Sequence, residues 1–137
     1  MIDATIFREL FFSPSVLFLL GLFIGSFLNV VIVRYNTGRT IATGRSMCFS
    51  CGRTLSWYEL LPVISFVFQG GRCRGCKSKV SWQYPLVEFM TGVLFALIVT
   101  FIPAAQGSGG ELLYYLAIAC ILMVITVYDI KHKIIPD

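Results

Sequence analysis

Charged side chains are scarce in this chain. Asp, Glu, Lys and Arg together make up 13% of its 137 residues, whereas hydrophobic residues make up 57%. A soluble domain ordinarily carries about 25% charged and about 45–50% apolar residues. The mean hydropathy of +0.82 points the same way. The shortage of charge argues against a water-soluble globular domain and favours one integral membrane domain with a small insert outside the bilayer.

Two familiar sequence signals are also missing. No glycine-rich loop stands between a strand and a helix, so no residue can be named that would bind a nucleotide-like cofactor. The first residues include Asp3, Arg8 and Glu9 instead of the basic leader of a signal peptide, and no small-residue cleavage site follows the first apolar stretch. We therefore expect that stretch to remain as a membrane helix.

Three long apolar stretches dominate the rest of the sequence. They run over Pro14–Val33, Pro85–Ile102 and Leu112–Tyr128, and the one Asp, Glu, Lys or Arg among them is Glu88. A helix that crosses a hydrocarbon core of about 30 Å needs about 20 residues, with a range of about 17–25. The sequence therefore predicts an all-α integral membrane protein with three transmembrane helices.

Basic residues are gathered between the first two stretches. That connection has eight Lys or Arg against one acid, Glu59; the basic residues are Arg34, Arg39, Arg45, Arg53, Arg72, Arg74, Lys77 and Lys79. Lys131 and Lys133 follow the third stretch, and Pro103–Glu111 contains no Lys or Arg. Short basic flanks mark the cytoplasmic side of a membrane. Topology explains this charge with fewer assumptions than nucleic-acid binding, so we expect no nucleic-acid partner.

The chain is expected to divide into seven segments around these helices. They are a short extracytoplasmic N-terminus (1–13), the first transmembrane helix (14–33), a cytoplasmic cysteine loop (34–84), the second transmembrane helix (85–102), an extracytoplasmic loop (103–111), the third transmembrane helix (112–128) and a cytoplasmic end (129–137).

Four cysteines in the basic loop have the spacing of a metal site. They form two C-x-x-C pairs with 21 residues between them: Cys48, Cys51, Cys73 and Cys76. Two such turns can supply the four thiolates of a tetrahedral structural zinc site, and nearby basic residues favour the thiolate. Reduced thiols without metal and two disulfides are the alternatives, and a cytoplasmic location disfavours disulfides. Cys120, in the third helix, is expected to be a packing residue.

Two carboxylates stand near the cytoplasmic ends of helices. Asp129 directly follows the third apolar stretch, where it would be partly desolvated, and ionisable residues at membrane depth are candidates for function. The alternative is a solvated acid paired with Lys131 or Lys133. Glu88 is expected either to pair with a loop arginine or to line a site near Asp129. Asp137 is a candidate cap or turn residue.

The first apolar stretch also carries small and polar residues. Gly21 and Gly25 form a G-x-x-x-G pattern, which favours close packing between membrane helices. Ser26 and Asn29 lie in the inner half of the same helix and are expected to form hydrogen bonds between helices.

Five segments together resemble the bacterial type IV prepilin leader peptidases, which are polytopic aspartic proteases. Besides the paired C-x-x-C motifs, they are Gly25–Arg34 (GSFLNVVIVR), Leu55–Phe66 (LSWYELLPVISF), Gly70–Cys76 (GGRCRGC), Tyr84–Gly92 (YPLVEFMTG) and Asp129–Asp137 (DIKHKIIPD). Any one motif would be weak evidence, but the combination is highly specific.

The resemblance implies an activity, a location and partners. Such enzymes lie in the bacterial inner membrane, cut the leader from prepilins and pseudopilins of type IV pilus and type II secretion systems at the cytoplasmic face, and methylate the new N-terminus with S-adenosylmethionine. In these enzymes the cysteine loop is associated with zinc. The first catalytic aspartate of the family corresponds to Asp129, and the second lies in a G-x-G-D motif further along.

The sequence departs from the family in one respect, because no G-x-G-D occurs in these 137 residues. We expect either an N-terminal fragment or a naturally short relative, and a chain that does not cleave prepilins by itself. Two main hypotheses follow: the N-terminal part of a membrane peptidase and methyltransferase, or a non-catalytic membrane zinc module that binds a pilin or a secretion partner. A membrane thiol–disulfide protein is a weaker third.

Overall fold

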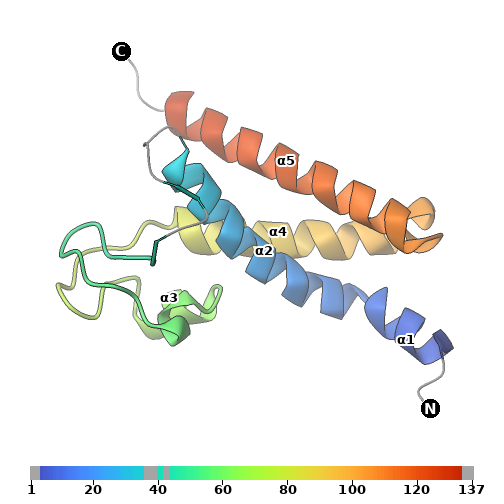
Figure 1. The fold of residues 1–137 in the computed structure, drawn as a ribbon, viewed down its shortest axis with the longest axis horizontal. Helices are drawn as coiled ribbons and strands as arrows, with labels where there is room; N and C mark the ends of the chain where they lie inside the picture. Colours follow the sequence, from blue (N-terminus) through green and yellow to red (C-terminus); the bar gives the residue numbers. More distant parts are fainter. Residues whose placement is uncertain (1–3, 36–39, 42–43, 134–137) are drawn as a thin grey trace.

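The fold is a bundle of long helices with a compact loop at one end (Figure 1). The computed structural model describes residues 4–35, 40–41 and 44–133; Arg39 and Asp137 lie outside these ranges. The elements in chain order are α1 (Ala4–Phe11), α2 (Pro14–Arg34), η1 (Trp57–Leu60), α3 (Ile64–Phe68), α4 (Gln83–Phe101), η2 (Pro103–Gln106) and α5 (Gly109–Lys133). The described residues form no strand beyond two isolated β-bridges.

Three of these helices are long and apolar enough to cross a membrane. Helices α2, α4 and α5 contain 21, 19 and 25 residues. Lipid offers no partner for backbone N–H and C=O groups, and a continuous helix satisfies them internally. The predicted fold class, an all-α membrane protein with a four-cysteine cluster between the first two long helices, is confirmed. Helix α5 continues to Lys133, so Asp129 lies one turn inside it.

Helices α2 and α4 pack closely because glycines face one another. A Cβ atom placed on Gly21 would lie 2.6 Å from Cα of Gly92, and one placed on Gly25 would lie 2.7 Å from Cα of Glu88. No larger side chain fits at either position without moving α4. The packing role predicted for the G-x-x-x-G pattern is therefore confirmed.

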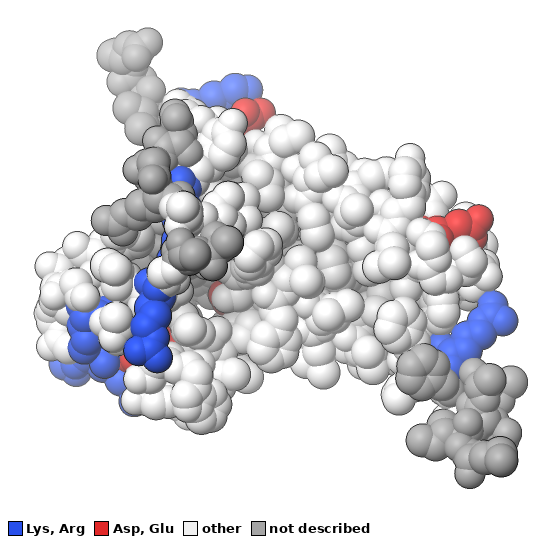
Figure 2. Space-filling view, viewed as in Figure 1, with Lys and Arg blue, Asp and Glu red and all other residues white. Residues whose placement is uncertain are grey.

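The buried apolar core lies toward the end of the bundle that holds η2. It consists of Leu17, Phe95, Val99, Ala105, Leu112, Leu116 and Ala119. The outer faces of the long helices remain apolar and exposed, and Figure 2 shows almost no charge along the middle of the visible face. Apolar surface of this extent is suited to lipid.

The two ends of the bundle differ in what they carry. At one end, Arg8 Nη2 donates a hydrogen bond to the Gln106 carbonyl oxygen at 3.1 Å, which joins α1 to η2. At the other end, the rings of Tyr35 and Tyr128 meet edge to face with centroids 5.3 Å apart. The cysteine loop lies at this second end, beside the C-terminal end of α2 and the first turns of α4 (Figure 1).

Candidate metal centre and catalytic residue

Each C-x-x-C pair sits in a tight turn closed by an antiparallel β-bridge. Met47 pairs with Thr54 around the first, and Arg72 pairs with Lys79 around the second. In the first turn the Gly52 N–H donates to the Cys48 carbonyl at 2.9 Å, and in the second the Lys77 N–H donates to the Cys73 carbonyl at 3.0 Å. The two turns therefore have the same backbone geometry.

The matching turns include a residue with positive φ at the same position. Gly52 has φ 71°, and Lys77 has φ 61°. Glycine adopts this left-handed conformation without steric cost, whereas lysine does not. The second turn keeps the geometry of the first despite that cost, which indicates that the position of its two cysteines is specified by the fold.

The two turns bring four thiols together. The Sγ atoms of Cys48, Cys51, Cys73 and Cys76 all lie within 4.8 Å of one another. Sulfur ligands at about 2.3 Å from a tetrahedral zinc ion stand roughly 3.8 Å apart. The Sγ atoms of Cys48 and Cys76 are 3.7 Å apart, so the donor set and its spacing fit such an ion.

The surroundings of the cluster favour thiolate over thiol. The backbone N–H of Cys51, then that of Ser50 and the hydroxyl of Ser78, hydrogen-bond to Cys48 and lower its pKa to about 6. The Ser78 hydroxyl and N–H also lower the pKa of Cys76. Thiolate is the form that binds a metal ion, so Cys48 and Cys76 are prepared for one. Desolvation and the neighbouring thiols instead raise the pKa of Cys51.

All five cysteines are free thiols in the structure. Cys73 is buried, whereas Cys51 and Cys76 are exposed at the edge of the loop. Cys120 is half-buried in α5 and packs against the apolar core, away from the cluster.

An ion pair ties the first cysteine turn to η1. Arg53 Nη2 donates to Glu59 Oε1 at 2.5 Å, and the Ser56 N–H donates to Glu59 Oε2 at 2.8 Å. Glu59 is only 6% exposed. The hydrogen bond from the Ser56 N–H, together with Arg53, lowers the pKa of its carboxyl group. This contact fixes the chain between the two cysteine turns. The Ser56–Glu59 part is a capping box that the S-x-x-E spacing could have indicated, whereas no pattern indicated the ion pair with Arg53.

Asp129 lies on the outer side of α5 at the loop end of the bundle. Its side chain is exposed, while Tyr128 turns inward against Tyr35. The other described acids lie elsewhere or have other partners: Glu59 binds Arg53, and Glu9 and Glu111 belong to the opposite end. Asp129 is therefore available to groups that approach from outside the three-helix bundle.

Glu88 binds a backbone group instead of the arginine that the sequence suggested. Its Oε2 accepts a hydrogen bond from the Val63 N–H at 2.7 Å, where Val63 has φ 58°. The ion pair found among the described residues is Arg53–Glu59, and Glu88 takes no part in it. Among the described arginines the expected pairing is not found, because the loop folds back over α4 with a backbone donor at Val63; Arg39 lies outside the described residues.

Asn29 links α2 to the start of α4, as expected. Its Nδ2 donates to the Tyr84 carbonyl oxygen at 3.1 Å, and the residue is 1% exposed. Ser26, one turn earlier, lies beside the Glu88 carboxylate. The sequence indicated these interhelical contacts but could not identify their partners.

The cysteine turns and the first two long helices coincide with a known domain. Residues 19–102 match the model of the bacterial peptidase A24 N-terminal domain. The chain belongs to the bacterial peptidase A24 family. The matched range of this A24 N-terminal domain contains both C-x-x-C turns, Asn29 and Glu88, and it stops before α5 and Asp129.

Curated relatives of the A24 domain carry one recurring name. A prepilin leader peptidase/N-methyltransferase from Myxococcus xanthus is 43% identical over 121 residues, which cover 88% of this chain and 35% of the relative. Enzymes of the same name from Bacillus subtilis and Klebsiella pneumoniae are 36% and 35% identical, and they cover 90% and 93% of this chain.

The relatives are longer than this chain. The aligned region spans 35%, 48% and 57% of the three relatives named above. No solved structure matches the chain. The family is therefore established for this chain, and the activity of the longer proteins is a matter for proposal.

Proposed function

We propose that the full-length protein is a membrane aspartic endopeptidase that removes the leader peptide of type IV prepilins and pseudopilins and then methylates the new N-terminus. The family of the N-terminal domain and the names of its relatives support this proposal. The observation that carries it at the level of residues is that Asp129 is exposed one turn before the end of α5, and this end of α5 lies at the same end of the bundle as the cysteine loop (Figure 1).

Asp129 would supply one half of the peptidase chemistry. An aspartic protease uses one carboxylate to take a proton from the attacking water and a second to give a proton to the substrate. The resemblance places the second acid in a G-x-G-D motif beyond these residues. The outward position of Asp129 on α5 leaves room for that second acid, and the chain alone is expected to be inactive in cleavage.

The four cysteines would hold a structural zinc ion. Four protein sulfurs complete a tetrahedral shell and leave no position for water or substrate. Zinc would then fix the loop over the end of the bundle without taking part in cleavage. S-adenosylmethionine would be the methyl donor for the second reaction.

The protein would lie in the bacterial inner membrane with the cysteine loop and Asp129 on the cytoplasmic side. Lys and Arg gather at this end of the bundle (Figure 2), which is the distribution expected of cytoplasmic flanks. The cut site of a prepilin, an apolar helix that resides in the membrane, would reach Asp129 at that interface.

Reconstituted full-length product tests the function directly. Incubated with a prepilin, it should release the leader and, with S-adenosylmethionine, yield an N-methylated pilin, as mass spectrometry would show. Residues 1–137, reconstituted in the same way, should do neither. Prepilin binding without cleavage by the full-length product would instead support a non-catalytic zinc module, and a coding sequence without G-x-G-D beyond Asp137 would agree with that outcome.

A further inference from the structure

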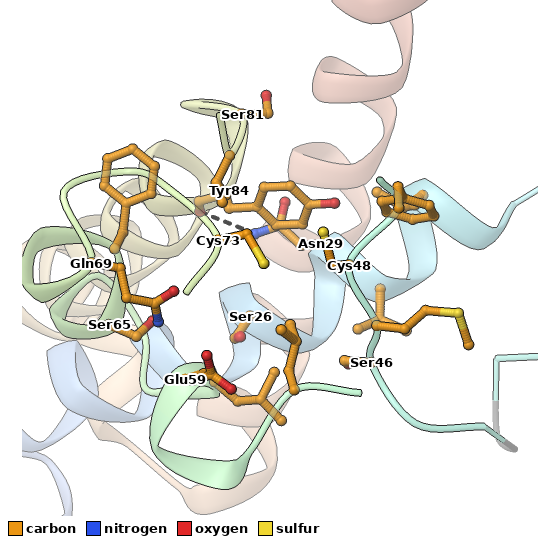
Figure 3. A pocket seen from close by; sticks show the side chains of 18 of the residues that line it. Ser26, Asn29, Ser46, Cys48, Glu59, Ser65, Gln69, Cys73, Ser81 and Tyr84 are labelled. Atoms are coloured by element: carbon orange, nitrogen blue, oxygen red, sulfur yellow. Dashed lines mark hydrogen bonds between the residues drawn. The ribbon is translucent and has the colours of Figure 1, made fainter. Parts of the chain in front are cut away.

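A large cavity lies between the cysteine loop and the membrane helices. Its volume is about 1220 Å³, and it is bounded by α2, the start of α4 and the loop. Figure 3 shows Ser26, Asn29 and Tyr84 from the two helices on its border, with Glu59 and Ser65 from the loop nearby. The cavity is distinct from the outer side of α5, where Asp129 lies.

The helix side of the cavity holds a carboxylate that has no cationic partner among the residues that the structure describes. Glu88 is 7% exposed and lines the cavity, and its carboxylate accepts hydrogen bonds from two neutral donors, the Val63 N–H and the Ser26 hydroxyl. No Lys, Arg or His among the described residues lies within ion-pair distance of it. A buried carboxylate is costly to keep charged, and neutral donors offset this cost less fully than a cation does, so a cation that enters the cavity would be stabilised beside Glu88.

A second acceptor on the lining of the cavity, Asn29 Oδ1, has no donor among the described residues. The hydrogen bond from Asn29 Nδ2 to Tyr84 fixes the amide and leaves Oδ1 as the free acceptor. This buried oxygen has no hydrogen-bond partner. Buried acceptors are rarely left unpaired, because each one costs the free energy of its lost hydration. With the hydroxyl of Ser26, the site gathers three oxygen acceptors on its helix side.

The approach to the cavity is apolar. Phe23 and Phe27 line it from α2 and are 57% and 54% exposed, on a helix face suited to lipid. A ligand can therefore extend from the oxygen acceptors toward the hydrocarbon. A protonated primary amine presents three N–H donors, as the lysine ammonium does, which matches Glu88, Asn29 and Ser26 in number and in charge.

We propose that this cavity binds a primary ammonium group at the end of an apolar segment, with Glu88 as its counter-ion, and that the natural ligand is the new α-amino terminus of a cleaved pilin. The lining of the cavity also includes basic residues, namely Arg34, Arg45, Arg72 and Lys79. The identity of the ligand therefore rests on the proposed function, whereas the preference for an ammonium rests on the oxygen acceptors of the helix side. The site would hold the amine in place for methylation, at a position separate from Asp129.

Binding of paired peptides tests this proposal without any cleavage. The probe is an apolar peptide with a free N-terminus and a C-terminal fluorophore, and its control is the same peptide N-acetylated. Full-length protein is placed in nanodiscs of phosphatidylcholine and phosphatidylglycerol. Neither lipid headgroup contains a primary amine that could compete with the N-terminus of the peptide. We expect acetylation to weaken binding by roughly 10-fold or more, since it removes both the charge and the donors.

Glu88→Gln separates charge from structure. The glutamine oxygen can still accept the Val63 N–H, so the loop should keep its fold and melting temperature. This variant should bind the free-amine peptide roughly 10-fold or more weakly and no longer distinguish it from the acetylated one. Glu111→Gln, an exposed acid at the opposite end, should behave as wild type.

Three outcomes would overturn the proposal. They are equal affinity of the wild type for both peptides, unchanged discrimination by Glu88→Gln, and a Glu88→Gln variant that loses affinity for S-adenosylmethionine but not for the peptide. Leader cleavage by the same wild-type preparation is scored separately. Its absence would contradict the proposed peptidase while leaving the measured amine preference interpretable.

Discussion

At the scale of single residues, the cysteine loop depends on a few polar contacts in a small space. Four thiols converge from two turns, and Arg53 binds the otherwise buried Glu59 beside them. A loop of this size has little apolar core of its own, since large side chains such as Trp57 and Phe68 are 77% and 81% exposed. Small domains of this kind commonly depend on a metal for their structure.

Replacing Cys73 should remove the metal. Cys73→Ser exchanges the buried sulfur for a hydroxyl that binds zinc poorly, so the zinc content should fall from about one ion per chain to near zero. Elemental analysis of the purified protein measures this. Cys120→Ser is the matched control and should keep its zinc; equal zinc in both variants would exclude the four-sulfur site.

The Arg53–Glu59 pair should stabilise the loop in a pH-dependent way. Glu59→Gln keeps an oxygen for the Ser56 N–H but loses the charge, so the loop should melt a few degrees lower, as followed by the fluorescence of Trp57. Because the pKa of Glu59 is lower in the folded protein than in the unfolded chain, the ion pair stabilises above the unfolded pKa and is lost as the pH falls through the folded pKa.

The difference between wild type and Glu59→Gln should therefore shrink in acid. Glu111→Gln, an exposed acid at the other end of the bundle, serves as the control and should leave the loop melt unchanged at every pH. A difference that grows as the pH falls would contradict the assigned direction of the Glu59 pKa.

At the scale of elements, the contact between α2 and α4 positions the cavity residues of both helices and the cysteine loop. Asn29, Glu88 and the glycines all belong to this pair of helices, and the loop is anchored to it through Val63. Helices in lipid gain little from hydrophobic burial, so close backbone contact and buried hydrogen bonds decide how they pair.

Gly25→Ala should weaken this contact. The added methyl group would lie 2.7 Å from Cα of Glu88, a backbone atom that cannot yield without moving α4. Overpacking of this kind costs about 1–3 kcal/mol, which should appear as a lower melting temperature of the purified protein in detergent. Gly109→Ala, which meets nothing within 4 Å, should change stability by less than about 0.5 kcal/mol. Equal effects would show that the glycine contact is unimportant.

The long helices could be predicted from sequence because their signal is local. Each of the three helices could be predicted from its own apolar run, without knowing which segments it contacts. The spacing of the two C-x-x-C pairs was enough to predict the four-cysteine cluster. The contact of Glu88 was beyond the sequence, since it depends on how the loop folds back over α4, whereas the contacts of Glu59 are local and its capping box has a readable S-x-x-E spacing. Val63 supplies a backbone donor from a left-handed conformation, which no residue pattern indicated.

At the scale of the whole molecule, the basic end that carries the cysteine loop and the end that carries η2 should face opposite sides of the membrane. Ser108→Cys, in the connection between α4 and α5, should react with a membrane-impermeant maleimide on intact cells. Lys131→Cys, near the end of α5, should react only after permeabilisation. The reverse pattern would invert the proposed orientation and place Asp129 outside the cytoplasm.

The account as a whole depends on Asp129 as a catalytic carboxylate of the full-length peptidase. The decisive measurement is the rate of prepilin cleavage by reconstituted full-length protein carrying Asp129→Asn, with Glu111→Gln as the control. Loss of one acid–base group should slow cleavage by roughly 10²–10⁴-fold, while the control cleaves at the wild-type rate and both variants keep their zinc. Cleavage by Asp129→Asn at the wild-type rate would contradict the account.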